Sequence, residues 1–236
     1  MEIVSAKEIQ TQRGTYLIYG PPGKGKTTTI KYLPGKTLVL DVDRTSRVLK
    51  GEENIDIIYV NNEDTWNDWG KIIKELSTNF VGVYDNIVVD NVSELERCIL
   101  SSLGSVGKNN GVPSQGDYQY MQFRMVNSLR YMKNLNSNLV WTAWEEIDLF
   151  QDSDGSQFNI ALPQINKKIR NNILGLCDVV GRLVEKEDGE RGFILSSTNS
   201  SYAKNQIDQR QGCKQNELIL SEQKNIKDER GNENGI

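Results

Sequence analysis

The eight-residue segment Gly20-Pro-Pro-Gly-Lys-Gly-Lys-Thr27 constrains the fold of this chain more than any other feature. It fits the pattern G-x-x-x-x-G-K-[ST], in which glycines let backbone N–H groups converge on a phosphate and the lysine adds a positive charge. A strand-forming run, Tyr16 to Tyr19, precedes the segment, and a helical stretch follows it, as the motif requires. The residues expected to bind the nucleotide are Gly20, Pro21, Pro22, Gly23, Lys24, Gly25, Lys26, Thr27 and Thr28.

Apolar, β-branched runs alternate with helix-like stretches along the chain. Most of these runs are continuously apolar, which is typical of parallel strands buried on both faces. Near the C-terminus, Asp188-Gly189 separates two short runs and predicts a hairpin at an antiparallel edge. The sequence thus predicts an α/β fold with a mostly parallel sheet and flanking helices. The expected parallel strands are residues 16–19, 38–42, 55–60, 87–90, 139–144 and 179–184.

The composition suits one soluble domain, with 37% hydrophobic and 25% charged residues in a chain of 236. We expect this domain over residues 1–205 and a flexible polar tail over residues 206–236, where Gln, Asn, Lys and Glu dominate. The chain has no histidine, which excludes histidine-based catalytic triads and histidine-ligated metals. Its three cysteines form no C-x-x-C pair, and no apolar run approaches membrane-spanning length, so a cytoplasmic location without a membrane partner is expected.

Carboxylates end two of the expected strands. Asp90 closes an apolar run, and together with Thr27 it is expected to hold Mg²⁺, which prefers oxygen ligands. Asp41 and Asp43 end the strand after Gly35, where one of them would polarise the attacking water. Asp43 is the first choice as this general base and Asp41 the alternative, although the same pattern also fits two carboxylates that only solvate a strand end.

The order of these motifs resembles that of RecA-type ATPases. The loop is followed by LVLDVDR, then IVVDN, then Thr142-Ala143-Trp144-Glu145-Glu146 at the end of a strand. More closely, the chain is similar to compact phage nucleotide-binding proteins, a core-only RecA-like group that includes single-strand annealing proteins. The likeness covers roughly residues 16–206 and closes with Tyr202-Ala203-Lys204-Asn205.

This resemblance implies a RecA-like P-loop ATPase that hydrolyses ATP with Mg²⁺, slowly and under stimulation by DNA or assembly. It further implies that the protein binds single-stranded DNA and promotes annealing or pairing in phage recombination or replication, in the cytoplasm of a bacterial host. Asp43 would activate water, and Lys204 would reach the ATP of a neighbouring subunit in a homo-oligomeric filament or ring. A phage single-strand-binding protein is a further expected partner. Trp144 stands where such proteins usually carry a polar sensor.

Two segments are the expected DNA-binding loops, residues 104–116 and 148–163. Basic side chains in and near them could hold a phosphate backbone without reading its sequence. Tyr118, Phe150 and Phe158 could stack on bases, although ordinary packing explains them equally well. The expected nucleic-acid-binding residues are Lys108, Lys167, Lys168 and Arg170.

Two other functions stay open at this stage. A nucleotide kinase would use residues 148–170 as a lid, but kinase lids usually carry several arginines and only Arg170 lies there. A nucleotide-gated adaptor, such as a helicase loader, would bind protein partners and hydrolyse ATP poorly. The choice between ATP and GTP is also open, because apolar contacts to the base leave no sequence signature.

Overall fold

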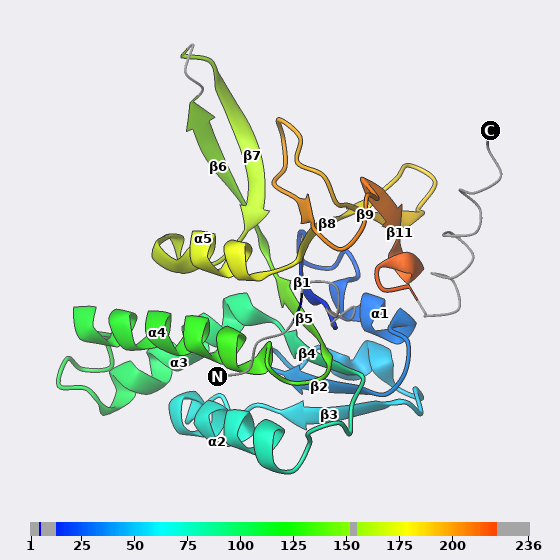
Figure 1. Ribbon diagram of the computed structural model, residues 1–236. Coiled ribbons are helices and arrows are strands. Elements are labelled where there is room, and N and C mark those ends of the chain that lie inside the picture. Colours follow the sequence, from blue (N-terminus) through cyan, green and yellow to red (C-terminus); the bar gives the residue numbers. More distant parts are fainter. Residues whose placement is uncertain (1–4, 6–12, 152–154, 221–236) are drawn as a thin grey trace, which may run out of the picture.

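The computed structural model describes residue 5, residues 13–151 and residues 155–220, and Figure 1 shows its arrangement. Among these residues, nine strands form one sheet in the order β11-β9-β8-β1-β5-β4-β2-β3, with β10 paired to β8. Six neighbouring strands of this sheet run parallel. They are β3 (Ile55–Tyr59), β2 (Thr37–Asp41), β4 (Asn86–Asp90), β5 (Asn138–Ala143), β1 (Thr15–Tyr19) and β8 (Val179–Glu185).

The predicted α/β fold with a mostly parallel sheet is confirmed. Every residue of β1, β2, β4 and β5 is buried, which explains the apolar run in the middle of each of these strands. Alternate side chains of each strand enter two separate hydrophobic clusters, one on each face of the sheet. The sheet therefore needs a covering layer on both sides.

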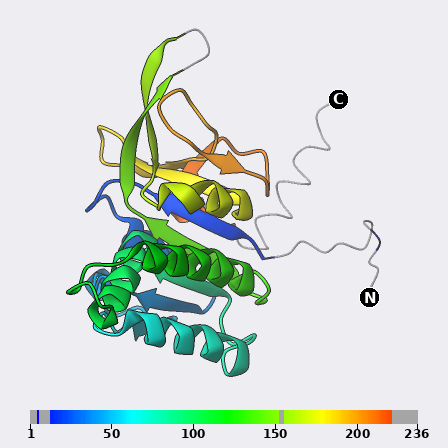
Figure 2. The ribbon, with the colours of Figure 1, turned by 90° about the vertical axis from the view of Figure 1, so that its left-hand side faces the viewer.

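Helices supply these two layers, as Figures 1 and 2 show. One face is covered by α1 (Lys26–Thr29) and by the 3₁₀ turns η2 (Ile30–Tyr32), η3 (Ser46–Leu49) and η4 (Gln215–Glu217). The opposite face carries α2 (Thr65–Thr78), α3 (Val92–Val106), α4 (Gln115–Met132) and α5 (Lys167–Leu176). Among the described residues, no helix has the length and apolar character needed to cross a bilayer.

Local signals in the sequence fix the starts of two long helices. The Asn91 side chain accepts a hydrogen bond from the backbone N–H of Glu94 at the start of α3. Ser114 and Asp117 form a reciprocal capping box at the start of α4. The expected DNA-binding loop at residues 104–116 is therefore shorter than predicted, because α3 continues to Val106 and α4 already begins at Gln115.

The predicted C-terminal hairpin is present, with a turn at Gly189 (φ 83°) between β8 and β9 (Arg191–Ile194). Beyond it, strand pairing continues past the expected boundary at residue 205. β10 (Lys204–Asn205) pairs with β8, and β11 (Gly212–Lys214) adds a further antiparallel strand next to β9. Residues 206–220 therefore belong to the domain, whereas residues 221–236 of the expected tail lie outside the described residues.

The second expected DNA-binding loop is instead a two-stranded antiparallel ribbon. β6 (Glu145–Gln151) pairs with β7 (Gln157–Pro163), and both views show this ribbon projecting from the domain. Polar and apolar residues alternate over only part of β6, from Glu146 to Leu149, because Phe150 follows Leu149 directly. Phe150 and Phe158 face each other across the ribbon at 5.4 Å between ring centroids, and residues 152–154 of the expected loop lie outside the described residues.

Candidate functional site

The predicted phosphate-binding loop connects the carboxyl end of β1 to the start of α1. Gly23 and Gly25 have positive φ angles of 77° and 99°, which side chains rarely tolerate, so glycine is needed at both positions. Because α1 begins at Lys26, the first backbone N–H groups of this helix have no partners within it. The curled loop and the helix start thus present several donors to one small volume, as anion binding requires.

Lys26 folds back over this loop. Its ammonium donates hydrogen bonds to the carbonyl oxygens of Gly20 (2.8 Å) and Pro21 (3.0 Å). Burial lowers the pKa of this ammonium, while the negative charges of Asp90 and Asp43 act in the opposite direction. The side chain is buried rather than exposed, so its charge is held against the loop by specific contacts.

Thr27 and Asp90 meet at the tips of α1 and β4. The Thr27 hydroxyl donates a hydrogen bond of 2.7 Å to one carboxylate oxygen of Asp90. The other oxygen accepts a hydrogen bond from the hydroxyl of Thr142, at the end of β5. Burial raises the pKa of Asp90 to about 6, against the lowering effect of these two hydrogen bonds. An adjacent hydroxyl and buried carboxylate are the oxygen donors that suit Mg²⁺, so the residues present fit this ion.

The two candidate bases after β2 have different surroundings. Asp41 is buried and accepts backbone N–H groups of Thr45 and Ser46, so it shapes the loop that follows the strand. Asp43 accepts hydrogen bonds from the Thr45 hydroxyl (2.7 Å) and from the Asn91 side chain. Since the Thr45 hydroxyl also lies 3.4 Å from that of Thr27, Asp43 connects to the site through side-chain hydroxyls, whereas Asp41 contacts Thr45 only at its backbone N–H.

A family model described as an AAA domain matches residues 13–207, most of the chain. The chain belongs to this AAA domain family. The match includes the phosphate-binding loop, β4 with Asp90, and β5 with Thr142. AAA domains are P-loop NTPases, which agrees with the geometry of the loop and of the Thr27–Asp90 pair. No curated protein matches this sequence. The match supports a P-loop NTPase rather than the narrower group of phage recombinases.

Lys204 lies apart from the phosphate-binding loop of its own AAA domain. Its ammonium donates to the carbonyl oxygens of Leu174 (2.9 Å) and Gly175 (3.4 Å), at the C-terminal end of α5. Carbonyl groups at this end of a helix have no partners within the helix, and a cation there is stabilising. Within one chain, Lys204 therefore caps a helix, and the predicted contact with a neighbouring subunit's nucleotide stays a prediction.

The expected nucleic-acid-binding residues are brought together only in part. Lys167 pairs with Asp148, and Arg170 pairs with both Glu146 and Asp148 of the projecting ribbon. Arg170 is largely buried by these contacts, which neutralise much of the expected positive patch. Lys168 is exposed, and the described residues place no carboxylate within ion-pair distance of it. Lys108 lies separately, in the short loop before α4.

Sequence reasoning missed three side chains at or near the loop. Thr142 donates a hydrogen bond to Asp90 near the end of β5, two residues before Trp144, the residue predicted to stand at the sensor position. Trp144 instead packs under the guanidinium of Arg97, 4.7 Å from its ring centroid. Arg191 and Gln215 reach the loop from β9 and η4, through strand pairing that no local motif reveals.

Gln215 touches the phosphate-binding loop from the C-terminal segment. Its side-chain amide donates to the carbonyl oxygen of Gly25 (2.9 Å) and to the hydroxyl of Thr29 (3.0 Å). A carbonyl and the next N–H point in opposite directions across a planar peptide. Holding the Gly25 carbonyl therefore helps to fix the direction of the Lys26 N–H, one of the donors expected to face a phosphate.

Proposed function

We propose that this AAA domain binds ATP with Mg²⁺ and hydrolyses its terminal phosphate. The observation that carries the proposal is the contact between the Thr27 hydroxyl and the Asp90 carboxylate, directly beside the loop that holds Lys26. In a P-loop enzyme a hydroxyl and a strand-tip carboxylate hold the metal, and the lysine binds the outer phosphates. Bound Mg²⁺ would neutralise charge on the phosphate groups.

Asp43 is the residue best placed to orient the attacking water. It connects to Thr27 through Thr45, and it adjoins the site through Asn91, the residue after Asp90. Burial raises the pKa of its carboxyl, with a further contribution from the charge of Asp41. A carboxylate with a raised pKa accepts a proton more readily at neutral pH, as a general base must.

Phosphate release from Mg-ATP tests this proposal. We expect turnover in the wild-type protein, and its loss in Lys26→Ala and in Asp90→Asn. Lys31→Ala is the matched control. Lys31 lies in η2, directly after α1, and its ammonium pairs with Glu52 instead of contacting the phosphate-binding loop. If the Lys26 and Asp90 variants hydrolysed ATP at the control rate, the assignment of this site would be wrong.

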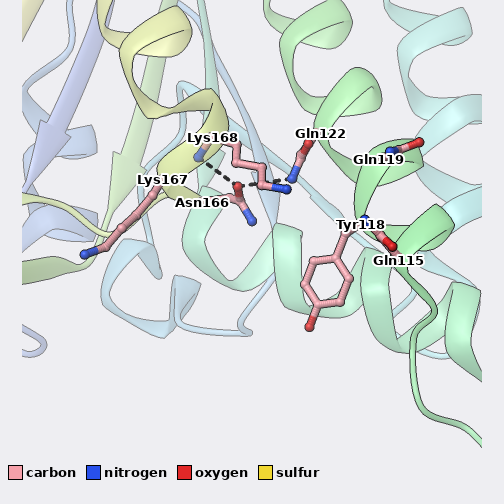
Figure 3. Close-up of a pocket in the computed structure, with 7 residues that line it drawn as sticks. All are labelled: Gln115, Tyr118, Gln119, Gln122, Asn166, Lys167 and Lys168. Atoms are coloured by element: carbon pink, nitrogen blue, oxygen red, sulfur yellow. Dashed lines mark hydrogen bonds between the residues drawn. The ribbon is translucent and has the colours of Figure 1, made fainter.

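We further propose that the AAA domain binds single-stranded DNA, as its resemblance to phage annealing proteins implies. A cleft of about 560 Å³ between the N-terminal ends of α4 and α5 supports this role. Tyr118 and Lys168 line it together with glutamine and asparagine side chains, as Figure 3 shows. An aromatic ring beside a lysine without an acidic partner suits a base and its phosphate.

Binding of a labelled oligothymidylate, measured by fluorescence anisotropy at two salt concentrations, tests this second proposal. We expect Lys168→Ala to weaken binding and the affinity to fall with salt. Lys71→Ala, an exposed lysine of α2, is the control. No affinity for the oligonucleotide, combined with a nucleotide-dependent protein partner, would favour an adaptor instead. Phosphate transfer to a nucleoside monophosphate would favour a kinase.

A further inference from the structure

Arg191, the first residue of β9, lies against the phosphate-binding loop. A Cβ atom added to Gly25 would lie 2.6 Å from Nη1 and 3.3 Å from Cζ of Arg191. The guanidinium thus fills the space that a side chain at position 25 would need. Glycine at this position serves both the positive φ of the loop and the approach of this arginine.

The guanidinium lies close to the loop, but at least one of its N–H donors lacks a hydrogen-bond partner in the part of the chain that the structure describes. Its Nε is buried and, among the described residues, has no hydrogen-bond partner. The nearest carboxylate oxygen is that of Glu185, 3.8 Å from Nε, and the same oxygen already binds the Lys24 ammonium at 3.2 Å. A guanidinium carries five N–H donors, and burying one of them without an acceptor is unfavourable. Such a group is ready to bind an anion.

The sheet order indicates which part of a nucleotide would meet this arginine. β8 and β9 lie on one side of β1, whereas β5 and β4, with Asp90, lie on the other side. A triphosphate whose outer phosphates lie beside Thr27 and Asp90, and which runs across the tip of β1, would extend towards β9. Its innermost phosphate would then lie on the side from which Arg191 approaches Gly25.

We propose that Arg191 is a nucleotide-binding residue whose guanidinium contacts the α-phosphate from the side of β9, within the same chain. This inference rests on the proposed nucleotide-binding function. It adds a second contact for the nucleotide, on the side of the loop opposite the proposed metal ion. The Arg191 side chain is one-third exposed (33%), so its outer N–H groups can reach a ligand and place a fixed positive charge beside the loop amides. The planar guanidinium can donate two parallel hydrogen bonds to one phosphate, which a lysine at this position could not.

Calorimetric titration with ADP and with a non-hydrolysable ATP analogue tests the proposal. We expect Arg191→Ala to weaken both ligands by the same factor, roughly ten- to hundredfold, because both carry the α-phosphate. Arg191→Lys should restore only part of the affinity, and Arg191→Gln serves if the alanine variant does not fold. Lys214→Ala is the matched control, since it removes a cation from neighbouring β11 that pairs with Glu190.

The outcomes separate the inference from the function on which it rests. Unchanged ADP affinity in a folded Arg191 variant, or a loss confined to the ATP analogue, would overturn the α-phosphate contact while the wild type still bound nucleotide. An equal loss in Lys214→Ala would overturn it as well, because the effect would then be one of net charge. A wild-type protein that binds neither ligand would overturn both proposals.

Discussion

The two sides of the phosphate-binding loop are built by different means. On the side of the proposed Mg²⁺ ion, called the metal side below, Asp90, Thr142 and Asp43 lie at or just after the carboxyl ends of parallel strands, and each occurs in a short motif. On the opposite side, Arg191 and Gln215 come from antiparallel edge strands and the turn that follows them. The first side follows from the sequence because parallel strands end together. The second depends on pairing between distant segments.

The largest effect is expected on the metal side. Lys26→Ala should weaken ATP binding by roughly a hundredfold, because it removes a charge held directly over the loop. Calorimetric titration measures this change, and Lys31→Ala should leave the affinity as it is. An affinity within about threefold of wild type would show that the loop does not hold the outer phosphates through this residue.

A second prediction separates the two carboxylates that follow β2. Asp43→Asn should lower turnover by on the order of a hundredfold or more with little change in ATP affinity, as expected for loss of a general base. Asp41→Asn should instead lower the melting temperature, since Asp41 accepts two backbone N–H groups. Single-turnover phosphate release and thermal melting of both variants check this, and equal turnover in Asp43→Asn and wild type would contradict it.

A smaller effect is expected on the side of the edge strands. Gln215→Ala should weaken nucleotide binding by about threefold, because one neutral hydrogen bond to the loop is lost. Gln211→Ala, an exposed glutamine just before β11, is the control in the same titration. If the two variants bound nucleotide equally well, the C-terminal segment would not support the loop.

The smallest expected effect is a change of stability with pH. It depends on Glu96, which connects α3 to the start of α5. Buried Glu96 of α3 accepts the backbone N–H of Asn166 at the start of α5, and Glu146 and Arg97 are the nearby charges. Burial raises the pKa of Glu96 to about 8, from an ordinary value of 4.5. The folded state therefore binds this proton more tightly than the unfolded state, and the stability it provides is lost as the pH rises towards 8.

Glu96→Gln should remove this pH dependence. Relative to wild type, the melting temperature of the variant should be higher at pH 8.5 than at pH 5.5 by a few degrees, about 2–4 °C for each kcal/mol. Thermal melting at the two pH values measures the difference. The same offset at both values would mean that Glu96 does not hold a proton in the folded protein.

The sequence predicts the parts of the structure that depend on a local motif or periodicity. It does not predict the parts that depend on pairing between distant segments. The parallel strands, the phosphate-binding loop and the Thr27–Asp90 pair could be predicted because each depends on local periodicity or on one motif. The ribbon of β6 and β7 could not be predicted because polar and apolar residues alternate over only part of β6, and the acidic residues of the segment are equally typical of a polar loop. β11 was missed because a three-residue strand in a polar segment carries no signal until its partner β9 is known.

Binding of Mg-ATP by the wild-type protein, titrated calorimetrically with and without Mg²⁺, tests the central claim most directly. We predict saturable binding at one site per chain, and a clear loss of affinity when Mg²⁺ is removed or when Asp90 is replaced by asparagine. Absence of binding at millimolar ATP, or an affinity indifferent to both Mg²⁺ and Asp90, would contradict the assignment of this loop as a nucleotide site.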